Sequence, residues 1–239
     1  MIIATKNLSL QINKEFNKIK NNLMANIFTS SIGKKLIMSI TGLFLILFLF
    51  IHVTINALSL ISPEAFAAGC EFMSLPIVTV MVPILAAGFI FHIIYAFVLY
   101  LMNYKARGKE RYAVANRAQT DDWAAKNMIF LGIVILGILA FHLTHFWANM
   151  QLPEFLGEEA SDPVMLLGET FSNPIILVLY ILWFIALWFH LTHGFWSAFQ
   201  TIGLDNQIWM KRWKAVGYVV ATILVGLFIV IALYAHFVY

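Results

Sequence analysis

The sequence predicts an all-α integral membrane protein, a bundle of five transmembrane helices. Of its 239 residues, 62% are hydrophobic and only 11% are charged, whereas soluble domains contain about 25% charged residues. Five stretches lack Asp, Glu, Lys and Arg, and each can hold the roughly 20 residues that cross a bilayer as a helix. Strands are excluded because the stretches show no alternation of apolar and polar residues, and because a helix satisfies its own backbone hydrogen bonds in lipid.

The charge-free stretches give the expected elements in chain order. They cover residues 36–63, 72–104, 127–153, 170–204 and 215–239. From them we expect helices at about 36–61, 77–104, 126–151, 173–202 and 213–238. Residues 1–34 are expected to be a cytoplasmic segment before a membrane domain of residues 35–239, because residues 1–23 are rich in Asn and Lys and lack the apolar core of a secretory signal.

Charged side chains between the expected helices are segregated by sign. With five crossings, the N-terminal segment, the second loop and the fourth loop share one side, which receives all 15 Lys and Arg residues. The other side receives only acids, namely Glu64, Glu71, Glu154, Glu158, Glu159, Asp162 and Glu169. The positive-inside rule then places the N-terminus in the cytoplasm and the C-terminus outside. The net charge of +3 therefore reflects membrane orientation and indicates no nucleic-acid partner.

The single cysteine, Cys70, limits the redox chemistry that the chain can support. It cannot form an internal disulfide, a four-cysteine zinc site or an iron–sulfur cluster, and no C-x-x-C-H string attaches a haem covalently. The sequence contains neither G-x-G-x-x-G nor a P-loop, so no dinucleotide or ATP site is indicated. Any redox centre must use other ligands.

All seven histidines fall in the charge-free stretches, and none lies in a loop. Ionisable groups at membrane depth are costly and usually mark function, although a single buried histidine is more often a packing residue. The distribution favours function, because four helices each carry one or two: His52, then His92, then His142 with His145, then His190 with His193. We expect the seventh, His236, to be structural.

Counting along the helices separates these histidines into two depths. His52 and His145 lie 12 and 9 residues from the nearest outer acid, whereas His92 and His190 each lie 21 residues from theirs. At about 1.5 Å per residue, the two pairs differ clearly in depth. Facing imidazoles in a bundle core are what a six-coordinate b-type haem requires, so two pairs predict two haems. Zinc is disfavoured because it usually recruits a carboxylate or thiolate.

Several short strings are more specific than the histidines alone. They are FTSSIGKK at residues 28–35, Ser39-Ile-Thr-Gly and His52-x-x-x-Asn56 in the first helix, Phe72-Met-Ser-Leu-Pro76 in the first outer loop, and FHLTHGFWSAFQTIG at residues 189–203. On these strings, residues 24–239 resemble the di-haem cytochrome b membrane anchors of succinate dehydrogenases and fumarate reductases, in their Bacteroidetes-like form.

The resemblance implies one axial haem-iron ligand from each of four helices. His52 and His145 match the ligands of the outer haem, and His92 and His190 match those of the inner haem. Within the doublets, the family's third ligand is followed by residues like Phe146-Trp147, and its fourth precedes a helix-ending glycine by 13 residues, as His190 precedes Gly203.

Three further positions stay open. His142 and His193 lie three residues from a matched ligand, so each can contact a haem propionate or a quinone, or only pack. Ser39 matches a family position near the inner haem's propionates, but a serine in a membrane helix more often bonds the carbonyl four residues earlier.

The resemblance also implies a function. The chain would be the anchor of a succinate:menaquinone oxidoreductase in the bacterial cytoplasmic membrane, linking the tricarboxylic acid cycle to the respiratory chain. A flavoprotein with FAD and an iron–sulfur subunit would dock on its cytoplasmic face, and the chain would not act on succinate alone. Because quinone reduction consumes protons, Glu64, Glu71 and His142 are candidates for the quinone site by location.

Two other functions remain open at this point. The anchor of another quinone-linked dehydrogenase, such as a formate dehydrogenase or hydrogenase, would also contain histidine pairs, but should lack the string at 189–203. A transporter could use a haem-free histidine relay, although such proteins usually have Asp, Glu or Lys at mid-membrane depth.

Overall fold

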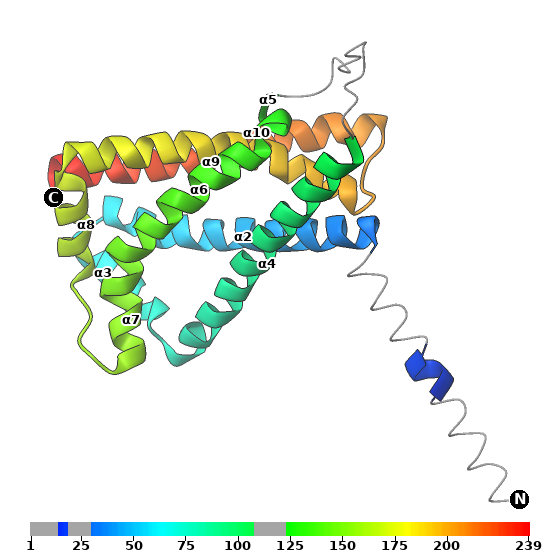
Figure 1. The fold of residues 1–239 in the computed structure, drawn as a ribbon. Coiled ribbons are helices and arrows are strands. Elements are labelled where there is room, and N and C mark those ends of the chain that lie inside the picture. Colours follow the sequence, from blue (N-terminus) through cyan, green and yellow to red (C-terminus); the bar gives the residue numbers. More distant parts are fainter. Residues whose placement is uncertain (1–13, 19–29, 108–122) are drawn as a thin grey trace, which may run out of the picture.

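The computed structural model describes residues 14–18, 30–107 and 123–239, which contain helices and no strand (Figure 1). Five helical segments are long and apolar enough to cross a membrane. They are α2 (Ser31–Ala57, extended by η1, Leu58–Leu60), α4 (Pro76–Arg107), α6 (Met128–His142) with its continuation to Leu156, α9 (Pro174–Thr201) and α10 (Gln207–Val238). The all-α membrane bundle is thereby confirmed. Most of the expected segment 1–34, including residues 1–13 and 19–29, lies outside the described residues.

Capping side chains set the helix starts, which differ from the sequence-based bounds. The Ser30 hydroxyl accepts from the Gly33 amide at 3.0 Å, so α2 begins before residue 36. The Asn206 side chain accepts from the amides of Ile208 and Trp209, so α10 begins before residue 213. Such caps satisfy the free amides of a first turn. The charge-based bounds excluded these turns because they contain Lys, whose long stem lets the charge stay in water.

Short helices connect the spans at the end of the bundle that carries the acids. Here α3 (Pro63–Met73) and α8 (Pro163–Ser172) pack against each other, and α8 also packs on α10. Both begin with proline after a capping side chain, Ser62 and Asp162 respectively, as helix starts often do. At the opposite end, α5 (Trp123–Lys126) leads into α6.

Four of the spanning helices form a ring. Going round it, α2 packs on α4, α4 touches α6, α6 packs on α9, and α9 packs on α2. The fifth, α10, lies outside the ring along α9 and α2, and Figure 1 shows α9 and α10 running side by side. In this order α2 is diagonally opposite α6, and α4 is diagonally opposite α9.

Two glycines allow neighbouring helices to approach closely. A Cβ at Gly88 would lie 2.7 Å from the Phe44 ring, and one at Gly217 would lie 3.2 Å from the Phe195 ring. Gly88 therefore brings α4 onto α2, and Gly217 brings α10 onto α9. The most buried core lies among α2, α9 and α10, whereas no described side chain of α4 is fully buried.

Successive spans run in opposite directions (Figure 1), which brings every described Lys and Arg of residues 30–107 and 123–239 to one end of the bundle. The basic end contains Lys34, Lys35, Lys105, Lys126 and Lys214, and the acidic end contains Glu64, Glu71, Glu154, Asp162 and Glu169. We use these two names below.

Candidate functional site

Six histidines form two clusters inside the helix ring. The first cluster, nearer the acidic end, contains His52 on α2, His142 at the end of α6, and His145 in the next turn. The ring centroids of His52 and His142 are 5.9 Å apart. This cluster joins two helices that are diagonally opposite in the ring.

The second cluster, nearer the basic end, contains His92 on α4 with His190 and His193 on α9. The ring centroids of His92 and His190 are 6.3 Å apart. Since α4 and α9 form the other diagonal, both clusters lie across the centre of the bundle, where a flat ligand can contact all four helices. The structure thus groups His92 with His190.

The ring separations suit a metal ion held between two imidazoles. Two metal–nitrogen bonds of about 2 Å each, with the two ring radii added, place the centroids about 6 Å apart. The observed 5.9 and 6.3 Å agree with this spacing.

Hydrogen bonds fix the tautomer of one histidine in each cluster. Nδ1 of His145 lies 3.1 Å from the Phe141 carbonyl, which can only accept, so Nδ1 carries the proton. Nδ1 of His92 lies 3.3 Å from the Thr41 hydroxyl. The same hydroxyl lies closer to the Ile37 carbonyl, at 2.9 Å, and with its one proton on that shorter contact it accepts from His92. Both histidines therefore keep an unprotonated Nε2, the arrangement of most histidine metal ligands.

Two other ring nitrogens in the clusters are buried and make no hydrogen bond to a described residue. Nδ1 of His142 and Nδ1 of His190 have no hydrogen-bond partner among the described residues. Leaving such a group unpaired in an apolar interior costs free energy, so each unpaired atom needs an explanation. For Nδ1 of His142 and Nδ1 of His190, the described residues supply no such partner.

His142 and His145 each have one feature of a metal ligand. His142 has the ring spacing to His52, whereas His145 has the fixed tautomer and packs on Phe141 at 4.0 Å. His142 ends α6, and His145 lies inside η2 (Leu143–Trp147), a π-helical turn that continues into α7 (Ala148–Leu156). π-helical turns are rare and occur frequently at functional sites.

Ser39 and His193 lie on the basic side of the second cluster. The buried Ser39 hydroxyl donates to the Lys35 carbonyl at 3.0 Å, which is the local bond weighed from the sequence. One turn further, a Cβ at Gly42 would lie 3.4 Å from the His92 ring. His193 packs edge-on against Trp196 at 4.7 Å.

A hollow of about 440 Å³ opens at the basic end of α2 and α9. Its lining residues are Ile32, Lys35, Ser197, Gln200 and Thr201. Lys35 lies seven residues before Gly42, and Ser197 lies seven after His190, so both sit on the helix faces that carry the second cluster. The hollow therefore lies below that cluster and offers a cation and polar side chains.

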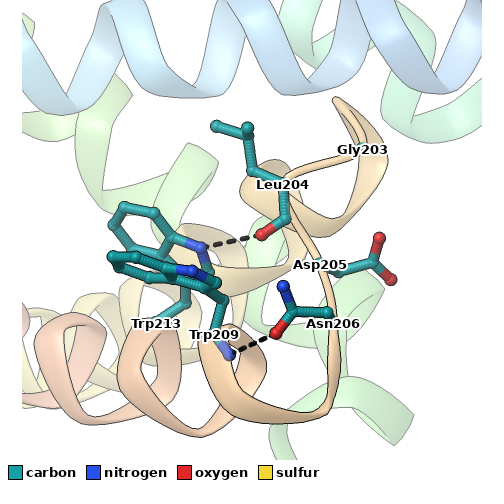
Figure 2. A pocket seen from close by; sticks show the side chains of 6 residues that line it. All are labelled: Gly203, Leu204, Asp205, Asn206, Trp209 and Trp213. Atoms are coloured by element: carbon teal, nitrogen blue, oxygen red, sulfur yellow. Dashed lines mark hydrogen bonds between the residues drawn. The ribbon is translucent and has the colours of Figure 1, made fainter.

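A second hollow, of about 350 Å³, lies at the turn between α9 and α10 (Figure 2). Figure 2 shows the stacked indoles of Trp209 and Trp213, with Trp213 donating to the Leu204 carbonyl at 2.9 Å. Gly203 has a φ of 83°, a conformation that favours glycine. The turn ends the string that begins at residue 189, and we assign it a structural role.

The acidic candidates lie away from both clusters. Glu64 and Glu71 are exposed on α3. At the start of that helix Glu64 accepts a hydrogen bond from its own amide and another from Ser62, which hold the pKa of its carboxyl below the usual value. Only His142, the third quinone candidate, belongs to a cluster.

Two residues that the sequence did not single out surround His142. The ring of Tyr180 lies 6.2 Å from that of His142, and the ring of Trp183 lies 5.6 Å from it. Both α9 side chains are buried, and the Tyr180 hydroxyl and Trp183 Nε1 lack hydrogen-bond partners among the described residues. The sequence signal was two polar aromatics three residues apart in a charge-free stretch.

His236 and Cys70 lie outside the clusters. Nδ1 of His236 bonds the Phe171 carbonyl at 2.7 Å, joining α10 to α8. Burial, with the charges of Asp162 and Glu154, raises the pKa of the Cys70 thiol to about 11, so the thiol stays protonated at neutral pH.

Fold and site together define a multi-pass, all-α membrane protein with two histidine clusters between diagonal helices. Comparisons of the chain with models of known protein families, with curated proteins and with solved structures find no match. The function must therefore be argued from the site.

Proposed function

We propose that the protein is the membrane-anchor cytochrome b subunit of a succinate:menaquinone oxidoreductase, with two bis-histidine b-type haems. The observation that carries this proposal is the pair of imidazoles of His92 and His190, which lie across the centre of the bundle with ring centroids 6.3 Å apart. His92 and His190 are the proposed ligands of the inner haem, and His52 and His145 those of the outer one.

The chain's own residues would bind and orient these haems. A bound haem supplies one-electron chemistry at its iron, and the protein contributes ligation, orientation and a dry surrounding. Thr41 and the Phe141 carbonyl hold the His92 and His145 rings with Nε2 free. Lys35 and Ser197 line the hollow below the second cluster. They would provide a cation and a hydroxyl for the carboxylates of the inner haem.

The distribution of charge supports the orientation and the side of docking. By the positive-inside rule, the basic end faces the cytoplasm of a bacterium. A flavoprotein with FAD and an iron–sulfur subunit would dock there, and succinate oxidation to fumarate would release two electrons and two protons. Menaquinone would take up two electrons and two protons to become the quinol, which balances the oxidation of succinate.

Two features favour this function over the alternatives. The charge-free stretches contain no Asp, Glu, Lys or Arg, which disfavours a proton-relay transporter. The string at 189–203 favours a succinate dehydrogenase anchor over that of another quinone-linked dehydrogenase.

A reduced-minus-oxidised spectrum with pyridine haemochrome quantitation tests the proposal. We expect two b-type haems per chain, and one in His92→Ala and in His190→Ala. The control, His236→Ala, should keep both haems because its ring bonds the Phe171 carbonyl of α8, outside the clusters. Absence of haem from the wild-type protein would overturn the proposal. Reduction of the haems by succinate in the purified complex tests the identity of the partners.

A further inference from the structure

The two proposed ligands of the outer haem share a local arrangement. Each is followed, four residues later, by an asparagine whose side chain bonds the histidine's own backbone carbonyl. Nδ2 of Asn56 donates to the His52 carbonyl at 2.8 Å. Nδ2 of Asn149 donates to the His145 carbonyl at 2.7 Å. Because α2 and α6 with its continuation are diagonally opposite in the helix ring, the same contact occurs on both sides of the first cluster.

The proposed inner ligands and His142 lack this arrangement. The residue four positions later is Ala96 after His92, Phe146 after His142 and Gly194 after His190. None of these three side chains can donate a hydrogen bond. The asparagines therefore accompany the outer pair, and within the doublet they accompany His145 and not His142.

The bond from asparagine to a carbonyl does not by itself indicate a function. Polar side chains in helices often bond the carbonyl four residues earlier, and Nδ2 of Asn127 does so with the Trp123 carbonyl at 2.9 Å. Asn56 and Asn149 differ from Asn127 in what they bond and where they lie. Both bond a proposed ligand, and since α2 and α6 run in the same direction (Figure 1), both lie one turn beyond that ligand towards the acidic end.

At His145 the arrangement holds the ring and the backbone together. Nδ1 of the ring bonds the Phe141 carbonyl at 3.1 Å, while Asn149 bonds the carbonyl of the same histidine. An amide group has two N–H donors, and Nδ2 of Asn149 also lies 3.3 Å from the Thr144 carbonyl. Both bonded carbonyls belong to the π-helical turn. A rotation of the ring or a shift of this turn would break one of these bonds, so together they fix the direction of Nε2.

We propose that Asn56 and Asn149 are a matched pair of positioning residues for the outer haem. Each holds the backbone of the ligand one turn before it, and neither contacts the iron. A metal site needs its donor atoms held within about 0.5 Å of the productive geometry, and the groups behind the ligands commonly supply this support. The inference rests on the proposed function and adds to it two residues that act through the ligands.

The test uses the purified complex with Asn56→Leu and Asn149→Leu, which remove the carboxamide and keep a side chain of similar size. We expect the outer haem to transfer to apomyoglobin about five- to tenfold faster in each variant, the change expected for loss of one neutral hydrogen bond. The largest g value of the outer haem's ferric EPR signal should also change, because it depends on the angle between the two imidazole planes. The inner haem should keep its retention and its signal, since neither of its ligands has such an asparagine.

Two further variants separate positioning from a general loss of stability. Asn149→Ser keeps a donor that can reach the carbonyl four residues earlier, so it should restore the retention and the EPR signal of the outer haem. Asn127→Leu removes the same kind of bond from the Trp123 carbonyl and should leave both haems unchanged.

Two results would overturn the inference. One is an outer haem with unchanged retention and EPR signal in both leucine variants. The other is an equal change at both haems, because the proposed support belongs to the outer ligands alone. Failure of the proposed function looks different, since the wild-type protein itself would then contain no haem, whereas failure of this inference alone leaves two haems in the wild type.

Discussion

The hydroxyl of Thr41 on α2 lies 3.3 Å from Nδ1 of His92 on α4. With the Thr41 proton on the closer carbonyl of its own helix, the hydroxyl accepts from Nδ1 and leaves Nε2 of His92 unprotonated, in a ring whose centroid lies 6.3 Å from that of His190. One side-chain contact between two helices thus fixes the tautomer that a haem ligand requires.

Thr41→Val should weaken the inner haem site. The valine is close in shape but cannot accept from Nδ1, so the imidazole loses orientation and becomes a weaker base. We expect about tenfold weaker haem retention, within the range for lost partners of metal-bound histidines, and a higher inner-haem midpoint potential. Haem content and a redox titration measure both effects, and Thr41→Ser, which keeps the hydroxyl, should resemble the wild type.

The α6 doublet can be resolved by comparing two variants. His145→Ala should lose the outer haem, leaving one per chain, because its tautomer is fixed for ligation. His142→Ala should keep two haems and raise the KM for quinone. The opposite pattern, with haem loss in His142→Ala, would keep the function and exchange the two roles.

The helices were predictable because absence of charge over 25 or more residues is a direct consequence of the lipid environment. The ends of the helices could not be predicted in this way. They depend on local geometry, namely the caps made by Ser30 and Asn206 and the lysines whose long stems let the charge stay in water. In the site, helical spacing put His142 and His145 on one side of a helix. In the structure His145 lies in a π-helical turn that begins directly after His142, and no periodicity reveals such a turn. Tyr180 stood out only once its surroundings showed an unpaired hydroxyl.

Gly88→Ala should destabilise the contact between α2 and α4. The added Cβ would lie 2.7 Å from the Phe44 ring, so the ring or the helix must move. Overpacking of this kind costs about 1–3 kcal/mol, and displacement of α4 should also weaken the inner haem. Thermal loss of the haem Soret band measures this. Gly137→Ala is the matched control, because its Cβ meets nothing within 4 Å.

Cys70 should react with alkylating reagents only at high pH. Burial and two nearby acids raise its pKa to about 11, so the reactive thiolate is scarce at pH 8 and increases as the pH approaches 11. The rate of iodoacetamide modification against pH, followed by mass spectrometry, measures this shift. The unfolded chain should react with a midpoint near the ordinary value of about 8.5, and an identical profile for the folded protein would contradict the burial.

Lys214 offers a test of docking at the basic end. Its ammonium lies 4.6 Å from the ring centroid of Trp196, which also packs on His193 of the second cluster, so this lysine lies between that cluster and the basic end of the bundle. If an acidic partner surface approaches there, charge reversal slows association and changes its salt dependence. Lys214→Glu should therefore reduce co-purification of the iron–sulfur subunit and slow haem reduction by succinate, most strongly at low salt.

The control is Glu159→Lys, a charge reversal at the acidic end, which should leave both co-purification and haem reduction unchanged. Equal effects of the two reversals would indicate a general loss of stability and count against docking at the basic end.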